Sequence, residues 1–229
     1  MIIFFATFFL GAILASFFNV VAKSVPTKQN WYSRRSACPL CQTLLKPWQL
    51  IPILSYLMQK GKCQTCKSTI PISYLVVEFV GGLLFTTTLF LPFAPRLQMW
   101  LFLAMLFTVT LTDLYFQLIP NKILITFGIP LFLLQPQIAV AILSFLFFYL
   151  TGLIGSWLFK KETIGGGDIK LYLVIGFVLT LEFLLLSIVI TTVTALLYIL
   201  LWSKNKKQAI PFAPFIALGS LFSYLLMFW

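Results

Sequence analysis

Two aspartates, the only ones in the chain, are its best candidates for acid–base chemistry. Asp113 ends one apolar run and Asp168 opens another. A carboxylate at membrane depth is costly and is a functional candidate by default. Two such groups close together share one proton, so one can activate water as a base while the other protonates the carbonyl or the leaving amine. The pair predicts peptide hydrolysis of the aspartic-protease type.

The residues around Asp168 fit a candidate active-site loop. Gly165, Gly166 and Gly167 precede it, and Lys170 follows two residues later. Glycines let the backbone approach a substrate strand closely and adopt unusual φ and ψ angles before the helix. Because the chain has no histidine, Ser-His-Asp and Cys-His catalysis are excluded, as are the His motifs of zinc peptidases.

Each aspartate is also compatible with a role outside proteolysis. Asp168 is well placed to be a helix N-cap. Asp113 could be an interfacial carboxylate that pairs with Lys122. A further alternative is a small transporter whose two acids relay protons or cations. Transporters, however, place such acids near the membrane midplane and often contain repeats, and no repeat is visible here.

The cysteines form a candidate metal site. They occur as two CxxC pairs, Cys38 with Cys41 and Cys63 with Cys66. Pairs at this spacing are typical of a tetrahedral zinc site with four thiolates, and basic neighbours such as Lys62 favour the thiolate form. A pair of disulfides and a thioredoxin-like redox pair are the alternatives, but a cytoplasmic location argues against structural disulfides. Four thiolates leave no open coordination position, so the predicted Zn2+ is structural.

The composition determines which elements must position these groups. With 61% apolar and 9% charged residues, the chain is not a soluble globular protein. We predict an all-α polytopic membrane bundle of about eight helices, with a small four-cysteine cytoplasmic loop domain. Two runs, 122–135 and 169–181, are short for a full crossing. The other predicted runs are 2–22, 72–94, 97–113, 138–159, 183–202 and 209–228.

Basic residues orient these helices. All 16 Lys and Arg residues except Arg96 lie in or beside the segments 23–71, 114–121, 160–168 and 203–208. The positive-inside rule places these segments in the cytoplasm and both termini outside it. The net charge of +11 then indicates contact with the lipid bilayer and its anionic headgroups, and no nucleic-acid partner is expected. The first run lacks a basic n-region and a small-residue cleavage site, so we expect a retained helix.

The motifs, taken in order, resemble those of the type IV prepilin peptidases, membrane aspartic proteases of the GxGD type. Within that family they are most similar to the competence-type enzymes of Gram-positive bacteria. The motifs that carry the resemblance are Ala15–Val21 with Pro26, Ser36–Cys41, Leu50–Tyr56, Gly61–Cys66, Tyr74–Glu78, Thr112–Asp113 with Ile119–Asn121, Gly165–Leu171 and Pro211–Gly219.

The resemblance implies a bifunctional enzyme of the bacterial cytoplasmic membrane. It implies cleavage of the leader of type IV prepilins or pilin-like precursors at the cytoplasmic face, followed by N-methylation of the new N-terminus with S-adenosylmethionine. Asp113 and Asp168 match the catalytic aspartates, and the four cysteines match the zinc module. Gly61 and Glu78 are candidates for the methylation site, although Glu78 could instead be a structural acid neutralised by a basic loop residue.

These inferences divide the chain into three parts. Residues 1–22 form a first transmembrane helix, 23–71 a zinc-binding cytoplasmic loop associated with methylation, and 72–229 a seven-helix membrane aspartic peptidase domain. A peptidase-only relative is the remaining alternative within the family, and no oligomeric state is assigned.

Overall fold

The computed structural model describes residues 1–28, 35–134, 137–161, 163–202 and 210–228. Within these ranges the chain is helical and forms no named strand, which confirms the all-α prediction. Two isolated antiparallel bridges, Ala37 with Leu44 and Lys62 with Thr69, accompany the cysteine loop. The predicted cytoplasmic segment 203–208 lies outside the described residues.

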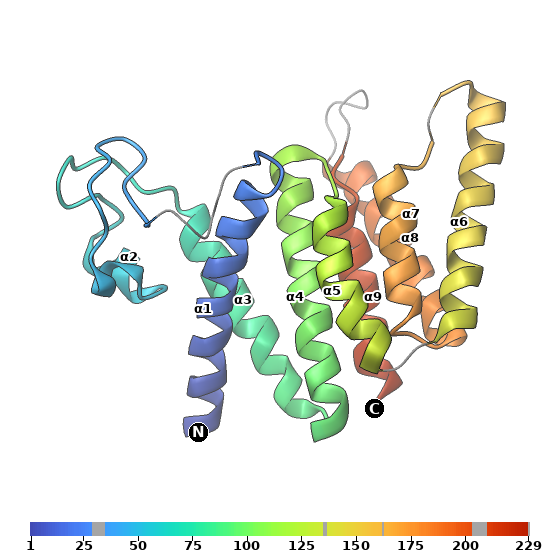
Figure 1. Cartoon of the computed structure of the whole chain (residues 1–229), viewed down its shortest axis with the longest axis horizontal. Helices are drawn as coiled ribbons and strands as arrows, with labels where there is room; N and C mark the ends of the chain where they lie inside the picture. The colour runs from blue at the N-terminus through green and yellow to red at the C-terminus, as the bar shows by residue number, and fades with distance from the viewer. Residues whose placement is uncertain (29–34, 135–136, 162, 203–209, 229) are drawn as a thin grey trace. The chain divides into compact units, whose positions relative to one another are not determined.

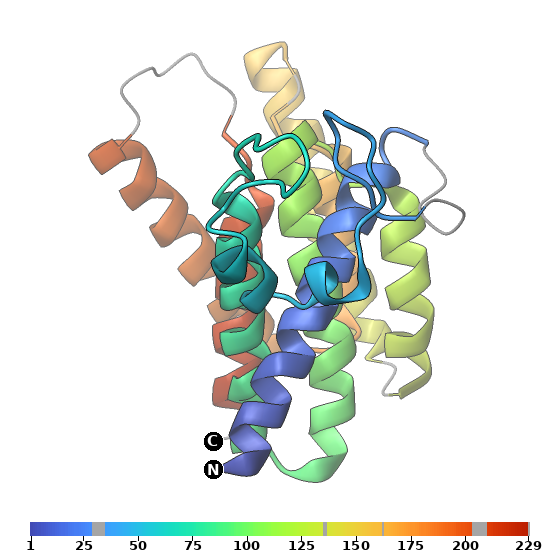
Figure 2. The same cartoon turned by 90° about the vertical axis from the view of Figure 1, so that its left-hand side faces the viewer.

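The first compact unit, Met1–Pro92, contains two apolar helices and the cysteine loop. The helices α1 and α3 pack side by side in both views (Figures 1 and 2). A Cβ atom at Gly11 would lie 2.6 Å from Cβ of Phe85, and one at Gly82 would lie 2.7 Å from the ring of Phe8. Glycines therefore allow the close approach that membrane helix pairs use. The helices of this unit are α1 (Ile2–Ser24), η1 (Pro47–Leu50), α2 (Leu54–Met58), α3 (Ser73–Thr87) and η2 (Thr88–Phe90).

The second compact unit, Phe93–Trp229, is a helical bundle. In it α4 packs on α5 and α9, α6 packs on α7, and α8 packs on α9. Its core contains fully buried large side chains, among them Phe102 of α4, Tyr172 of α7 and Tyr224 of α9. Its helices are α4 (Phe93–Phe116), α5 (Asn121–Leu134), α6 (Ile138–Phe159), α7 (Gly166–Gly176), α8 (Leu181–Trp202) and α9 (Ala213–Met227).

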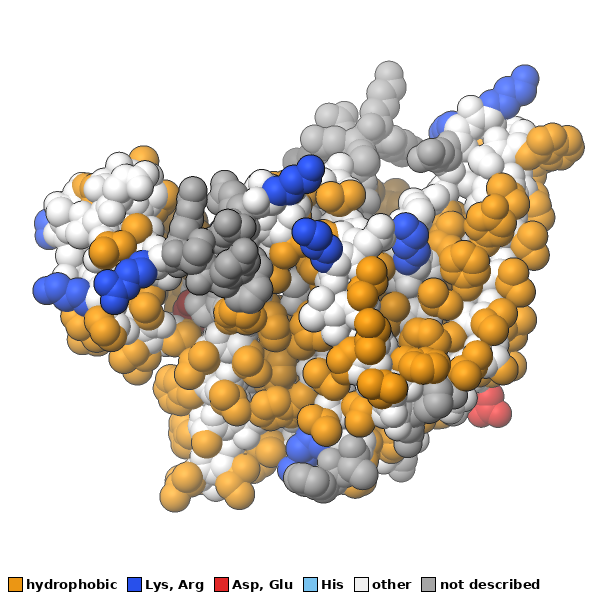
Figure 3. Space-filling view, viewed as in Figure 1, with side chains coloured by type: hydrophobic (Ala, Val, Ile, Leu, Met, Phe, Trp, Pro, Cys, Tyr) orange, Lys and Arg blue, Asp and Glu red, His pale blue; other side chains and the backbone are white. Residues whose placement is uncertain are grey.

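Helices occupy all of the predicted apolar runs, but they differ in length. Five of them, α1, α3 with η2, α4, α6 and α8, are long and apolar enough to cross a membrane by length and composition. The others are shorter: α5 has 14 residues, α9 has 15 and α7 has 11. Figure 3 shows hydrophobic side chains over the flanks of the helices in the second unit. The structure thus confirms a helical membrane-type fold, whereas the count of eight spans is not confirmed.

The boundary between the two compact units differs from the boundaries of the three predicted functional parts. That division separates 1–22 from 72–229, whereas α1 and α3 belong to one compact unit. The functional boundaries stay a prediction.

Candidate active site and metal centre

Asp113 lies in the last turn of α4 and is held there by the start of α9. Its side chain is only 7% exposed. Oδ2 accepts a hydrogen bond of 2.8 Å from the backbone N–H of Ala213, the first residue of α9. The first N–H groups of a helix have no partner within the helix, so a carboxylate is a natural acceptor for them. The structure gives Asp113 this partner, and the Lys122 side chain, which was the alternative, is exposed.

Asp168 lies in the first turn of α7 and is half-buried. The N-cap of this helix is Gly165, so the alternative that Asp168 is the N-cap is wrong. The Asp168 N–H donates to the carbonyl of Gly165 at 3.0 Å. A Cβ atom at Gly165 would lie 3.0 Å from Asp168 Oδ2. The carboxylate therefore folds back over Gly165, and a side chain there would crowd it.

The bundle brings the two aspartates into one neighbourhood. They come from the last turn of α4 and the first turn of α7, and the charge of Asp113 acts directly on Asp168. The chain segment that follows Asp113 also contacts the first turn of α7. A Cβ atom at Gly167 would lie 2.8 Å from Cβ of Ile119. This segment therefore helps to set the separation of the carboxylates.

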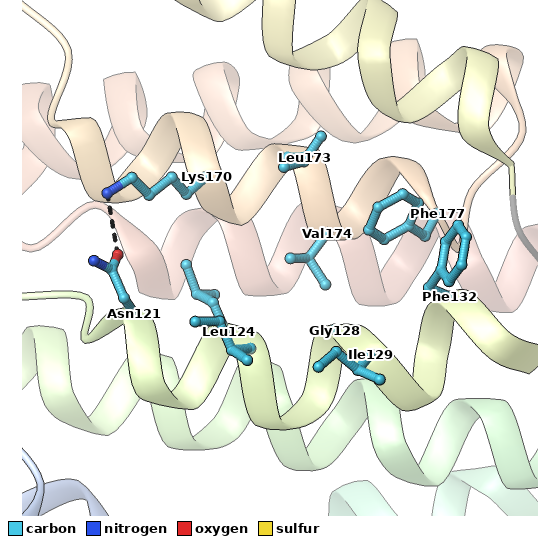
Figure 4. A pocket seen from close by; sticks show the side chains of 10 residues that line it. Asn121, Leu124, Gly128, Ile129, Phe132, Lys170, Leu173, Val174 and Phe177 are labelled. Carbon is cyan, nitrogen blue, oxygen red and sulfur yellow. Dashed lines mark hydrogen bonds between the residues drawn. The ribbon is translucent and has the colours of Figure 1, made fainter.

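A hydrogen bond reinforces that contact. Lys170 Nζ donates to Oδ1 of Asn121, the first residue of α5, at 3.1 Å (Figure 4). The sequence placed both residues in motifs but did not pair them. The two residues are 49 positions apart in the sequence, so no local pattern could reveal the contact.

The glycines differ from the prediction in their conformation. Gly165 has φ −63° and ψ 134°, and α7 already begins at Gly166. Among the described glycines, only Gly61 has positive φ. The prediction of unusual backbone angles before the helix is therefore wrong. Close packing against Ile119 explains Gly167, whereas a Cβ atom at Gly166 would meet nothing within 4 Å.

The four cysteines form a compact cluster in the first unit. Their Sγ atoms all lie within 4.8 Å of one another. Cys38 Sγ is 3.8 Å from Cys66 Sγ, and Cys41 Sγ is 3.9 Å from Cys63 Sγ. A tetrahedron of sulfurs about 2.3 Å from a zinc ion has edges of about 3.8 Å. All four thiols are free, so the geometry fits a four-thiolate metal site and not a pair of disulfides.

The two CxxC turns repeat the same backbone pattern. The N–H of the first cysteine donates five residues ahead, Cys38 to the Thr43 carbonyl at 3.0 Å and Cys63 to the Ser68 carbonyl at 2.8 Å. The residue after the second cysteine has positive φ in both turns, 59° at Gln42 and 58° at Lys67. Each turn is thus independently shaped to present two sulfurs to one point.

A hydroxyl group lies beside the sulfur of the second cysteine in each CxxC turn. Thr43 Oγ1 is 3.3 Å from Cys41 Sγ, and Ser68 Oγ is 3.0 Å from Cys66 Sγ. No motif recognised in the sequence predicted a role for these two residues. Both follow the second cysteine of a pair by two positions, and this shared spacing was the available signal.

Local hydrogen bonds favour the metal-binding form of two thiols. The backbone N–H groups of Cys41 and Leu40 lower the pKa of the Cys38 thiol to about 6. The hydroxyl and then the backbone N–H of Ser68 lower the pKa of the Cys66 thiol. Because the thiolate is the metal ligand, both effects favour metal binding at neutral pH.

Glu78 connects three segments of the first unit. It is 8% exposed and lies on α3. Its Oε1 accepts from the Ser16 hydroxyl of α1 at 2.9 Å, and its Oε2 accepts from the Ile53 N–H of the cysteine loop at 2.8 Å. Ile53 has φ 64°, a conformation that is costly for a β-branched residue. These hydrogen bonds make Glu78 a tie between the loop and the helix pair.

The backbone conformation and close packing at position 61 explain why the residue there is glycine. Its φ is 65°, and a Cβ atom there would lie 2.9 Å from the Tyr56 hydroxyl. Its carbonyl accepts from the Ile70 N–H at 2.7 Å. Both sequence candidates for methylation, Gly61 and Glu78, therefore shape the loop.

The apolar helices, the aspartate pair and the cysteine cluster define a helical membrane protein with two chemical centres. Residues 9–91 match the Bacterial Peptidase A24 N-terminal domain, and residues 100–200 match the Type IV leader peptidase family. The chain belongs to the type IV leader peptidase family, as the resemblance in its motifs predicts. It is accordingly an integral membrane protein.

Individual relatives are similar over most of their length. The chain is 37% identical to a Prepilin leader peptidase/N-methyltransferase of Bacillus subtilis (strain 168), over 95% of this chain and 92% of that protein. It is 30% identical to proteins of the same description from Legionella pneumophila, over 93% of this chain and 78% of that one, and from Pseudomonas aeruginosa, over 93% and 87%. No solved structure matches the chain.

Proposed function

We propose that this protein is a membrane aspartic endopeptidase that removes the leader of type IV prepilins or pilin-like precursors and then N-methylates the new N-terminus. The observation that carries the proposal is the placement of Asp113 and Asp168 in one neighbourhood of the second unit, where the charge of one acts on the other. Relatives described as Prepilin leader peptidase/N-methyltransferase support the substrate class and the second activity.

The cleavage step follows from two carboxyl groups that share a proton. The ionised carboxylate takes a proton from a water molecule, whose oxygen bonds to the scissile carbonyl carbon. The protonated carboxyl donates its proton to the carbonyl oxygen. These transfers give a tetrahedral intermediate with two hydroxyl groups. As its C–N bond breaks, one hydroxyl returns its proton to the carboxylate that donated before, and the leaving amine takes the proton that the other carboxyl group received from water. Ala213 orients Asp113 for this step, and the contacts of Ile119 and Asn121 with α7 position Asp168.

The cysteine cluster would hold Zn2+ through Cys38, Cys41, Cys63 and Cys66, and it fits that ion by ligand type and sulfur separation. Because four thiolates would fill the coordination sphere, a zinc ion held by them would organise the loop and would have no open position for a part in cleavage. The methyl group of the new amine would come from S-adenosylmethionine when that cofactor is bound. Gly61 and Glu78 support methylation by fixing the conformation of the loop.

We propose that the site faces the cytoplasm at the bacterial cytoplasmic membrane, with both termini outside the cytoplasm. The distribution of Lys and Arg in the sequence supports this orientation. A precursor with a basic leader and a long apolar helix would lie in the bilayer with its cleavage point at the inner interface. Carboxylates at that depth reach the bond without removing the substrate from lipid.

The test is the intact mass of a type IV prepilin co-expressed with the wild-type protein, with Asp168→Asn, or with Glu182→Gln as a control acid. We expect a product that has lost its leader and gained one methyl group with the wild type and the control, and no cleavage with Asp168→Asn. Shortening without a methyl group would leave a peptidase alone. An uncut precursor with the wild-type protein would overturn the proposal and favour a transporter.

A further inference from the structure

The cysteine loop carries exposed apolar side chains on and beside its two short helices, η1 and α2. No residue of either helix is buried. Leu54, Leu57 and Met58 have the i, i+3, i+4 spacing that places side chains on one side of a helix. Together with Leu50 and Ile51, they are between 43% and 71% exposed. We call these five side chains the apolar face of the loop, and exposed apolar side chains that cluster in this way mark an interaction surface.

Lys23 and Tyr74 mark the level at which the helix pair of this unit meets the membrane surface. Lys23 is in the last turn of α1, and Tyr74 is in the first turn of α3. Lys23 Nζ donates to the Tyr74 hydroxyl at 3.0 Å. Tyrosine rings and the charged ends of lysine side chains prefer the boundary between membrane and water. This pair therefore lies at the level of the lipid headgroups.

The loop reaches deeper than this pair. The N–H of Ile53, the N-cap of α2, donates to Glu78, which also accepts from the Ser16 hydroxyl. At about 1.5 Å per residue, Ser16 lies about 10 Å along α1 from Lys23, and Glu78 lies about 6 Å along α3 from Tyr74. The start of α2 is thus tied to the helix pair one to two turns inside the headgroup level. Both views show α2 alongside α1 and α3 and not beyond their ends (Figures 1 and 2).

Basic side chains flank the apolar face. The segment 23–77 contains no Asp or Glu, so the charge of the loop is entirely positive. Lys46 is the N-cap of η1, and Lys60 follows the last residue of α2 by two positions. Apolar side chains next to lysines are typical of segments that lie in the interface of an anionic membrane. The basic residues between 35 and 71 are all exposed, namely Arg35, Lys46, Lys60, Lys62 and Lys67.

We propose that the segment 47–58 is a membrane-interface anchor, with its apolar face among lipid acyl chains and with Lys46 and Lys60 among lipid phosphates. A second protein molecule is the other class of partner. The depth of the bond between Ile53 and Glu78 favours lipid, because a protein would have to displace the lipid around the helix pair to reach the apolar face. The proposal uses the membrane character of the chain and no part of the proposed peptidase or transferase activity.

The experiment uses the full-length protein in vesicles that mix phosphatidylcholine with phosphatidylglycerol. A photo-crosslinking residue replaces Met58, the most exposed side chain of the apolar face. Position 83 is the positive control, because Leu83 is 49% exposed on α3, which belongs to a candidate membrane span. Position 64 is the matched control within the loop, because Gln64 is an exposed polar residue of the second CxxC turn.

We expect lipid adducts in similar yield from positions 58 and 83, and few from position 64. Position 57 provides a second probe of the apolar face in case the first substitution disturbs the loop. If position 83 forms lipid adducts and neither 57 nor 58 does, the anchor is wrong. Adducts from 57 and 58 to protein in place of lipid would identify a protein-binding surface and overturn the proposal. Equal lipid yields from 58 and 64 would also overturn it, because no particular face would then enter the membrane.

The composition of the adducts tests the role of the lysines. Adducts from position 58 should be enriched in phosphatidylglycerol relative to those from position 83. Lys60→Gln should lower this enrichment by about fivefold, the effect of one lysine close to an anionic surface. The matched control is Lys122→Gln, which removes an exposed lysine of the second unit and should leave the enrichment unchanged. Equal enrichment in Lys60→Gln and in the wild type would contradict the contact of Lys60 with lipid phosphates.

Discussion

The two chemical centres of this protein are stabilised in different ways. In the cysteine loop, η1 and α2 contain no buried residues, and the order comes from backbone turns, the sulfur cluster and the tie to Glu78. The aspartates instead belong to helices α4 and α7, which contribute fully buried side chains such as Phe102 and Tyr172 to the core of the second unit. One centre depends on a few specific bonds and the other on packing. A single change should therefore disable one and leave the other.

The largest effect is expected from removal of the metal. Cys38→Ser removes one of four ligands, and structural zinc contributes about 10–16 kcal/mol to the folding of comparable small domains. We expect loss of bound zinc, protease sensitivity of the loop and loss of methylation, while leader cleavage continues. Metal content, limited proteolysis and product mass measure these outcomes.

Gln64→Ala, which changes a residue between two ligands, is the control and should keep the metal. Loss of cleavage together with methylation in Cys38→Ser would show that the centres do not fail separately.

An intermediate effect is expected from packing at the aspartate centre. Gly167→Ala places a Cβ atom 2.8 Å from Cβ of Ile119. Overpacking of this kind costs about 1–3 kcal/mol. We expect a lower thermal midpoint and slower cleavage, since the first turn of α7 must move and carries Asp168 with it.

Gly166→Ala is the matched control, because its Cβ atom meets nothing within 4 Å. Alanine is favoured over glycine in a helix by up to about 1 kcal/mol, so this variant should be as stable as the wild type or slightly more stable. Equal destabilisation by both variants would contradict the packing argument.

The smallest effect is expected from loss of the hydrogen bond between Ser16 and Glu78 in the first unit. Ser16→Ala removes the hydrogen bond to Glu78 Oε1. A hydrogen bond of this kind contributes about 0.5–1.5 kcal/mol, and one to a charged group somewhat more. Methylation should decrease more than cleavage, measured as the methylated fraction of the shortened product.

Ser156→Ala is the control, since the Ser156 hydroxyl bonds a carbonyl of its own helix. A larger loss of methylation in this control than in Ser16→Ala would refute the role given to the tie.

The sequence was most informative where a pattern is local. The apolar runs located the helices, and the CxxC spacing located the sulfur cluster, because both depend on neighbours along the chain. The length of α7 and the ordinary backbone angles of Gly165 were missed, since packing determines where that helix begins. The Ala213 N–H that binds Asp113 lies 100 residues away, and such a partner has no local signature.

That distant partner has a consequence for the order of synthesis. A nascent chain contains Asp113 and Asp168 well before Ala213 emerges and α9 inserts. Until then the Asp113 carboxylate lacks the donor that orients it. The peptidase would therefore be inert during its own production and become competent only when its last helix joins the bundle, so prematurely terminated chains would carry both acids without cutting neighbouring proteins.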